Sequence, residues 1–187
     1  MCKKIVIFDW GDTVMKDFSE FQGPMVNWPR VEVIGGIEES LSVINTHFTI
    51  CIASNAGASD AKLMGLALER VGIRDYFTYL FTSKELGYNK PDIKFFKEII
   101  FRIGVKPSEC IFIGNDYEKD IVPSKMVGMK TILYAESMVE GPTPLADVII
   151  QSMVELVEFN KLFQRCAESD SPADEYARCV EEEKQDD

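Results

Sequence analysis

The stretch Lys4-Ile-Val-Ile-Phe-Asp9-Trp-Gly-Asp12-Thr13-Val14 decides the fold. Four apolar residues, three of them β-branched, are followed by an abrupt change to polar residues at Asp9. A short apolar run bounded by turn residues is typical of a strand that is buried on both faces of a parallel sheet. A carboxylate therefore stands where the strand ends, and ligands bind at that edge of open parallel sheets. Asp is also a common turn residue, so this stretch alone leaves both interpretations of Asp9 open.

Strand and helix patterns alternate along the rest of the chain. Strands are predicted at 4–9, 48–53, 76–81, 110–113, 129–134 and 148–150, and helices at 37–45, 59–71, 92–103, 120–127 and 152–163. Such alternation predicts an α/β fold, namely a three-layer α/β/α, Rossmann-like, doubly wound parallel sheet. We expect a single core domain over residues 1–164, with a short flap at 15–30.

Composition narrows the class of protein. The chain has 187 residues, of which 46% are hydrophobic and 27% charged, as in ordinary globular domains. Its net charge of −11 argues against nucleic acid as a ligand, because phosphate backbones are bound by Lys and Arg. No apolar run is long enough to span a membrane, so no membrane partner is expected. The acidic segment 165–187 is predicted to be a disordered tail.

The five cysteines show no CxxC spacing and are odd in number. Cys51 and Cys110 lie in or beside apolar runs, where a thiol behaves as a small hydrophobic group. Free thiols are therefore favoured over a disulfide framework or a zinc site. No apolar signal-peptide region is recognised at the N-terminus, so a cytoplasmic location is expected.

Polar residues follow four of the predicted strands. They are Asp9 after the first strand, Ser54 after the second, Lys90 in the loop after the third, and Asn115, Asp116 and Asp120 after the fourth. Because the carboxyl ends of parallel strands share one edge of a sheet, these side chains can converge.

The residue types suit phosphoryl transfer. A carboxylate can attack phosphorus and form an aspartyl phosphate. The attacking and transferred groups are both negative, so the chemistry needs cations, which Mg²⁺ on Asp and Asn oxygens and a lysine would supply. A hydroxyl group and backbone N–H groups can hold the remaining phosphoryl oxygens.

Four motifs in this order resemble the haloacid dehalogenase-like (HAD) hydrolase superfamily, most of whose members are Mg²⁺-dependent phosphatases. The resemblance covers about residues 4–150. It rests on the segments Phe8–Val14, Ala53–Asn55, Asn89–Asp92 and Ile113–Asp120. Each motif alone is weak, but four in order on the expected elements are specific.

The resemblance implies a role for each matching position. Asp9 would be the nucleophile and a metal ligand, with the main-chain carbonyl of Gly11 as a second ligand. Lys90 would neutralise negative charge, and Ser54 with Asn55 would bind the phosphoryl group. The remaining positions are Asn115 or Asp116 for Mg²⁺, Thr13 for ordering the first loop, and Asp120 for supporting the metal loop.

Two positions depart from the pattern of the superfamily. Its phosphatases usually carry an acid/base Asp two residues after the nucleophile, where this chain has Gly11 and places Asp12 one residue later. We expect Asp12 as the candidate replacement, since glycine permits unusual backbone conformations. The usual metal-binding Asp after the glycine of the fourth motif is Asn115, which lacks charge, and Asp116 could compensate.

The spacing of the motifs leaves no room for a cap domain. About 40 residues separate Val14 from Ser54, and a flap, one helix and one strand occupy them. An uncapped site is expected to be open to a phosphorylated substrate, including a macromolecular one, or to be covered by a second subunit. The aromatic residues Phe21 and Trp28 of the flap either cover the site or pack on the core.

The leading hypothesis is an Mg²⁺-dependent phosphatase that acts through an aspartyl phosphate on Asp9. The alternative is a catalytically weak or inactive relative that binds a phosphorylated ligand or a protein partner, because Gly11 and Asn115 replace acidic residues. Cleavage of carbon–halogen or carbon–phosphorus bonds is disfavoured because no cap is found. The substrate and the oligomeric state stay open.

Overall fold

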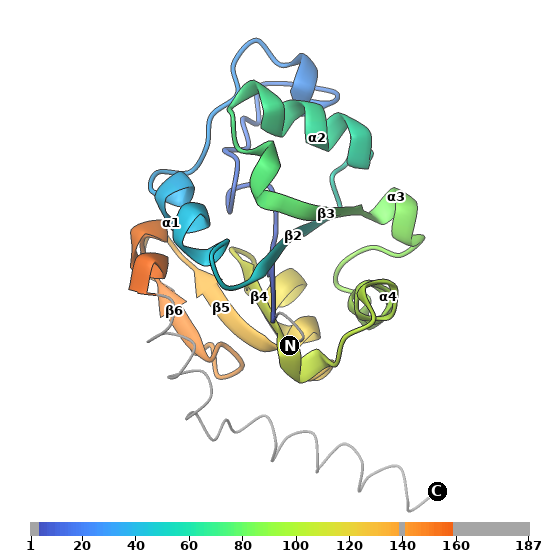
Figure 1. The fold of residues 1–187 in the computed structure, drawn as a ribbon, viewed down its shortest axis with the longest axis vertical. Helices are drawn as coiled ribbons and strands as arrows, with labels where there is room; N and C mark the ends of the chain where they lie inside the picture. The colour runs from blue at the N-terminus through green and yellow to red at the C-terminus, as the bar shows by residue number, and fades with distance from the viewer. Residues whose placement is uncertain (1–3, 139–140, 159–187) are drawn as a thin grey trace, which may run out of the picture.

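A computed structural model describes residues 4–138 and 141–158 (Figure 1). Its six strands pair in parallel in the order β3-β2-β1-β4-β5-β6. Their bounds are Ile5–Phe8 for β1, Thr49–Ser54 for β2, Phe77–Thr82 for β3, Cys110–Gly114 for β4, Lys130–Tyr134 for β5 and Val148–Ile150 for β6. All six lie where the sequence predicts them, and the doubly wound parallel sheet is confirmed.

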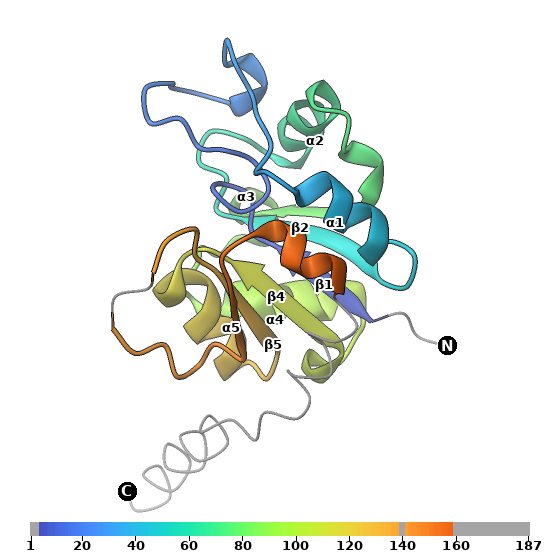
Figure 2. The same ribbon diagram turned by 90° about the vertical axis from the view of Figure 1, so that its left-hand side faces the viewer.

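Helices cover both faces of the sheet, which makes the fold three-layered (Figure 2). On one face lie α1 (Ile37–Ile44), α2 (Ala61–Arg70) and the 3₁₀ helix η5 (Met153–Glu158); on the other lie α4 (Ile93–Ile103) and its neighbour α5 (Val122–Met126). Short helical turns complete the chain: η1 (Met25–Asn27), η2 (Arg74–Tyr76), α3 (Ser83–Leu86), η3 (Pro107–Glu109) and the π-helical η4 (Tyr117–Ile121).

Strand β1 is the centre of the core, and all four of its residues are buried. Alternate residues face opposite layers because side chains along a strand point to opposite faces. Val6 and Phe8 pack with α1 and α2, whereas Ile5 and Ile7 pack with α4. Phe8 is in register with Ile52 of β2 and Ile113 of β4. Asp9 therefore leaves the sheet between the ends of these two neighbouring strands.

The flap, residues 15–30, packs beside α2 (Figures 1 and 2). The Arg70 guanidinium on α2 donates hydrogen bonds of 2.7 Å to the carbonyl oxygens of Val26 and Trp28. Trp28 itself is buried and donates from Nε1 to the carbonyl of Gly23 at 3.1 Å. Phe21 is half-buried and stacks at a tilt on Trp28, with ring centroids 5.6 Å apart. The flap aromatics thus pack on the core, and Trp28 also reaches the cavity described below.

Three local differences from the sequence prediction have physical causes. The predicted helix at 120–127 begins earlier, because the side chain of Asp116 accepts a hydrogen bond from the Lys119 amide and caps η4. The short helix α3, which was not predicted, begins at Ser83 because Thr82 and Glu85 form a reciprocal capping box. The predicted last helix is 3₁₀ over Met153–Glu158, and its remainder lies outside the described residues.

The predicted disordered tail, 165–187, also lies outside the described residues. Among the described helices, none has both the length and the apolar character needed to cross a membrane.

Candidate active site

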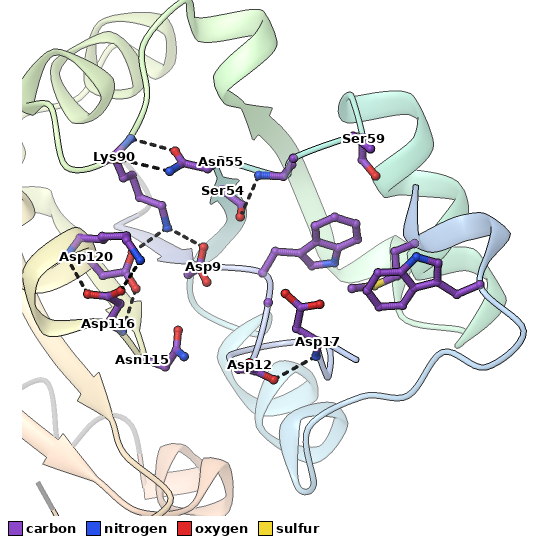
Figure 3. Close-up of a pocket in the computed structure, with 18 of the residues that line it drawn as sticks. Asp9, Asp12, Asp17, Ser54, Asn55, Ser59, Lys90, Asn115, Asp116 and Asp120 are labelled. Atoms are coloured by element: carbon purple, nitrogen blue, oxygen red, sulfur yellow. Dashed lines mark hydrogen bonds and ion pairs between the residues drawn. The ribbon is translucent and has the colours of Figure 1, made fainter. Parts of the chain in front are cut away.

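A cavity of about 430 Å³ opens at the carboxyl ends of β1, β2 and β4 (Figure 3). Residues from four separate loops line it. The predicted site residues among them are Asp9, Gly11, Asp12, Ser54, Asn55, Lys90, Asn115, Asp116 and Asp120. The sheet thus brings together side chains that are up to about a hundred positions apart in the chain, as the parallel topology predicts.

Lys90 is the centre of the buried wall of the cavity. Its Nζ lies 2.5 Å from Asp9 Oδ1 and 2.6 Å from Asp120 Oδ1. All three side chains are buried. One cation is therefore shared by two carboxylates in a region that is largely shielded from water.

The burial of this cluster shifts its proton equilibria. Burial opposes the charge on Lys90, but the Asp9 and Asp120 carboxylates outweigh it and raise the pKa of the lysine. Burial raises the pKa of Asp120 to about 6, with Lys90 opposing this rise and Asp9 adding to it. Lys90 consequently stays charged at neutral pH and provides a fixed positive charge beside Asp9.

Asn55 holds the main chain that carries Lys90. Its Oδ1 accepts a hydrogen bond of 2.8 Å from the Lys90 amide, and its Nδ2 donates one of 3.1 Å to the Lys90 carbonyl. Both polar atoms of the Asn55 side chain are thus engaged with the main chain of Lys90. Ser54 is buried at the end of β2, where its hydroxyl accepts a 3.4 Å hydrogen bond from the Ala56 amide.

Gly114 allows Asp120 to approach the end of β4. A Cβ atom at position 114 would lie 2.3 Å from Asp120 Oδ2, a separation that real Cβ atoms do not adopt. The same Oδ2 accepts a hydrogen bond of 3.1 Å from the Asp116 amide. Asp120 therefore bridges the lysine and the loop after β4, and this contact depends on the missing side chain of Gly114.

The loop after β4 also carries Asn115 and Asp116. Thr13 is buried and donates from its hydroxyl to Asn115 Oδ1 at 3.2 Å, which joins this loop to the one after β1. Asp116 forms an ion pair of 2.8 Å with Lys119. Burial opposes the charge on Asp116, but the hydrogen bonds and charge of Lys119 outweigh it and lower the pKa of the carboxyl group.

The loop after Asp9 forms the open wall of the cavity. Asp12 has a left-handed backbone conformation with φ of +53°, which Asp tolerates better than most residues. Its Oδ1 accepts a hydrogen bond of 2.9 Å from the Asp17 amide. Figure 3 shows the carboxylate of Asp17 directed back into the cavity, between Asp12 and the interior. Burial, with the charges of Asp12 and then Asp9, raises the pKa of Asp17.

The oxygen atoms of the residues that line the cavity suit a Mg²⁺ ion that is held by only a few protein ligands. Within the described ranges, no group of three His, Cys, Asp or Glu side chains could hold a metal ion. The carboxylate of Asp9, the amide oxygen of Asn115 and the Gly11 carbonyl line the same cavity. Mg²⁺ is commonly held by one or two carboxylates, with water and substrate oxygens completing its octahedron. Asp116 is less suited because Lys119 engages its carboxylate.

Several cavity residues were not predicted from the sequence. They are Trp10, Asp17, Met25, Ser59 and Lys119. Trp10 and Trp28 are buried and form an apolar wall next to the acidic loop. Trp10 follows Asp9 directly and could have been found from that position. Asp17 and Met25 could not, because the path of the flap is not encoded in any local pattern.

Comparison with known proteins shows the family of this chain. A family model described as haloacid dehalogenase-like hydrolase matches residues 4–134. A bovine protein, haloacid dehalogenase-like hydrolase domain-containing protein 3, is 35% identical over 137 residues, which are 73% of this chain and 49% of that protein. The glyceraldehyde 3-phosphate phosphatase of Methanocaldococcus jannaschii is 35% identical over 50% of this chain and 42% of its own length. The chain therefore spans half or less of these curated relatives.

Solved structures show the same fold. An uncharacterized protein from Listeria monocytogenes aligns with a TM-score of 0.73 at 23% identity, covering 87% of this chain and 99% of that one. A HAD phosphatase from Thermococcus onnurineus aligns with a TM-score of 0.61 at 26% identity, over 70% of this chain and 59% of that one. The sheet order, the four motifs at its carboxyl edge and the family match lead to one conclusion: this chain belongs to the haloacid dehalogenase-like hydrolases.

Proposed function

We propose that the chain is an Mg²⁺-dependent phosphatase that acts through an aspartyl phosphate on Asp9. The observation that carries the proposal is the pairing of Asp9 with buried Lys90 at the base of an open cavity. A carboxylate held there has one oxygen fixed by a cation, which leaves the other free to face a ligand. Relatives named as glyceraldehyde 3-phosphate phosphatase and ribulose-1,5-bisphosphate 5-phosphatase point to the same class of reaction.

The reaction takes place in two steps on Asp9. Its free carboxylate oxygen forms a bond to phosphorus as the bond from phosphorus to the leaving oxygen breaks, which releases an alcohol. Water then attacks the same phosphorus and breaks the acyl phosphate bond, which returns Asp9 and releases inorganic phosphate. Lys90 keeps its positive charge beside the reacting oxygens in both steps, because the two buried carboxylates hold its proton.

Other residues orient the phosphoryl group. Ser54 would donate its hydroxyl hydrogen bond, together with the backbone amide of Asn55. Thr13 would fix Asn115, and Asp120 would keep Lys90 and the Asp116 amide in place.

Mg²⁺ would be held by Asp9, the Gly11 carbonyl and Asn115, with Asp116 as a weaker alternative. When bound, it would neutralise charge on the phosphoryl oxygens and so permit the approach of the carboxylate. One solved relative of the same fold, the YfnB protein of Bacillus subtilis, is described as bound to magnesium. Of the three proposed ligands in this chain, Asp9 is a carboxylate, whereas the Gly11 carbonyl and the Asn115 amide oxygen carry no charge. We therefore expect Mg²⁺ to bind weakly in the absence of substrate.

The substrate we propose is a phosphorylated compound that reaches an uncapped site, and macromolecular phosphate esters are included. The acidic character of the chain makes nucleic acid an unsuitable partner, and we expect no membrane partner. The free buried thiols Cys51 and Cys110 fit a cytoplasmic location. An oligomer that covers the cavity is compatible with this proposal.

Hydrolysis of p-nitrophenyl phosphate in the presence of Mg²⁺ tests the mechanism. Asp9→Asn should reduce kcat by more than about 10³-fold, since the nucleophile is removed while its size is kept. Chelation of Mg²⁺ should abolish turnover, and added Mg²⁺ should restore it. Asp75→Asn, at an exposed position on η2, is the matched control and should keep wild-type activity. Equal activity of the wild type and Asp9→Asn would refute the mechanism.

The second candidate function is binding without efficient turnover. Gly11, Asn115 and the Asp116–Lys119 ion pair favour it, because together they leave fewer free carboxylates than a metal-dependent phosphatase would use. Calorimetry with Mg²⁺ and beryllofluoride separates the two functions. A beryllofluoride adduct on Asp9 together with turnover supports the phosphatase, whereas an adduct without turnover supports a phosphate-binding protein.

A further inference from the structure

The open wall of the cavity contains a carboxylate beside a glycine. A Cβ atom placed on Gly11 would lie 3.4 Å from Asp17 Oδ2 and 3.7 Å from its Cβ. The side chain of Asp17 therefore reaches, from six positions further along the chain, the space into which a side chain at position 11 would extend. Figure 3 shows this carboxylate beside the loop that runs from Asp9 to Asp12.

The loop geometry explains how Asp17 reaches this place. The amides of Val14 and Met15 both donate to the Trp10 carbonyl at 2.9 Å, and the Asp12 amide donates to the Met15 carbonyl at 2.7 Å. These bonds close a tight turn after Asp9. Asp12 then accepts the amide of Asp17 at 2.9 Å, which fixes the start of the flap against the turn. The hydrogen bonds within the turn, together with the bond from the Asp17 amide to Asp12, therefore fix where the main chain of Asp17 lies.

The other carboxylates of the cavity are already engaged. Asp9 and Asp120 share Lys90, Asp116 pairs with Lys119, and Asp12 holds the Asp17 amide. In the part of the chain that the structure describes, no ion pair joins the Asp17 carboxylate to a cation. The acidic groups nearest to it along the same loop are Asp12 and Asp9, so its carboxylate lines the cavity without a paired cation among the described residues.

We propose that Asp17 is the general acid and base of this site. During the first step its carboxyl group would donate a proton to the leaving oxygen as the bond from phosphorus to that oxygen breaks. During the second step its carboxylate would take a proton from the water that attacks phosphorus as the acyl phosphate bond to Asp9 breaks. Asp17 then carries a proton again, and the cycle is balanced. This inference rests on the proposed phosphatase function, and Asp12 becomes a positioning residue.

Leaving-group dependence distinguishes a proton donor from a structural residue. An alkyl phosphate such as glycerol phosphate needs a proton on its leaving oxygen, whereas p-nitrophenolate leaves without one. Asp17→Asn should therefore lower kcat/KM for the alkyl phosphate by about 10²–10⁴-fold and change kcat/KM for p-nitrophenyl phosphate much less. The phosphorylated form of Asp9 should accumulate in this variant, as intact-protein mass spectrometry would detect.

Two further variants sharpen the test. Asp12→Asn keeps an oxygen that can accept the Asp17 amide, so it should lose less activity than Asp17→Asn on the alkyl phosphate. Gly11→Asp in the Asp17→Asn background should restore much of the lost activity, because a side chain at position 11 would enter the same space at an ordinary contact distance. Asp75→Asn is again the matched control.

The outcomes separate failure of the inference from failure of the proposed function. If the wild type is active through Asp9 but Asp17→Asn matches Asp75→Asn on both substrates, the inference is wrong and the phosphatase stands. Equal losses on both substrates without rescue by Gly11→Asp would also overturn it, since a structural role has no leaving-group dependence. If Asp12→Asn loses activity on the alkyl phosphate and Asp17→Asn does not, Asp12 is the acid and the inference is wrong. An inactive wild type refutes both proposals.

Discussion

The two walls of the cavity differ in how their charges are held. In the Lys90 wall the side chains of Lys90, Asp9 and Asp120 are buried. The Lys90 ammonium group bonds both carboxylates, and the Lys90 main chain bonds the side chain of Asn55. In the wall formed by Gly11, Asp12 and Asp17, the two acidic residues are exposed. The hydrogen bond that joins them runs from the Asp17 amide to the carboxylate of Asp12. Both walls line the cavity around Asp9. Among the described residues, a cation pairs with the carboxylates of the Lys90 wall, and none pairs with those of the other wall.

This difference matches two separate chemical demands. A charge that must stay constant through a reaction is best held in a low-dielectric network in which every group is paired. A group that must gain and lose a proton is better placed where water has access and no cation holds it in one state. The buried wall is therefore suited to electrostatic stabilisation, and the open wall to proton transfer.

Removal of the central cation should break the buried wall most severely. Lys90→Met keeps most of the volume but leaves the Asp9 and Asp120 carboxylates close together without a cation. We expect the free energy of unfolding to fall by about 3–5 kcal/mol, because one partner of a buried ion cluster is lost. Urea denaturation followed by circular dichroism measures the change, and Lys84→Met, at an exposed lysine that donates to the Ala58 carbonyl, is the control.

The pH dependence of this loss has a definite sign. Burial already raises the pKa of Asp120 to about 6, and without Lys90 it rises further, because the cation that opposes this rise is gone. The native state then binds more protons than the unfolded state, so its stability falls as pH rises through that range. The destabilisation by Lys90→Met should therefore be smaller at about pH 5 than at about pH 8. A loss that does not change with pH would contradict the shared-cation account.

Gly114→Ala should disturb the same wall less strongly. The added methyl group would meet the Asp120 carboxylate at 2.3 Å and displace it from Lys90 and the Asp116 amide. Overpacking of this kind typically costs about 1–3 kcal/mol. Thermal unfolding measures the cost, and kcat should fall with it. Gly35→Ala, where no atom lies within 4 Å of the new Cβ, should have little effect and controls for the change in backbone entropy.

The smallest expected effect concerns the anchoring of the flap on α2. Arg70→Ala removes the two hydrogen bonds that hold the flap carbonyls of Val26 and Trp28 on α2. Because Arg70 is exposed, we expect a cost of about 1 kcal/mol, confined to the flap. Hydrogen exchange over residues 23–30 should become faster while exchange in β1 stays slow. Arg102→Ala, at another exposed arginine that bonds a carbonyl group, should leave the flap unchanged.

The prediction from the sequence succeeded where local patterns carry the information. The six strands were found because buried parallel strands are short apolar runs that end in turn residues. The positions of Asp9, Ser54, Lys90 and Asn115 at one edge followed from the parallel topology alone. The helix predicted at 92–103 was also found: Asp92 caps α4 by accepting the Lys94 amide, and Gly104 ends it in the left-handed conformation.

Elements that depend on distant contacts were predicted less well. The last described helix is 3₁₀, and it packs on α1, where the hydroxyl of Ser40 donates to the Met153 carbonyl at 2.5 Å. The pairing of Asp116 with Lys119, which makes Asp116 a poorer metal ligand, joins residues at i,i+3 spacing at the start of η4, an element that was not predicted to begin there. The replacement of the expected acid/base by Asp12 stays a prediction, and Asp17 competes with it.

The amino-acid sequence by itself determined the fold class and the identity of the residues at the reactive edge, because hydrophobic periodicity and strand-end polarity are local properties. Only the tertiary structure decided which of those groups are paired. Close approach at Gly114 places Asp120 on Lys90, and the turn after Asp9 brings Asp17 beside Gly11. Both contacts depend on where the backbone turns in space, and that path is set by hydrogen bonds and packing from several elements at once. Gly11 thus lacks a carboxylate of its own but has one next to it.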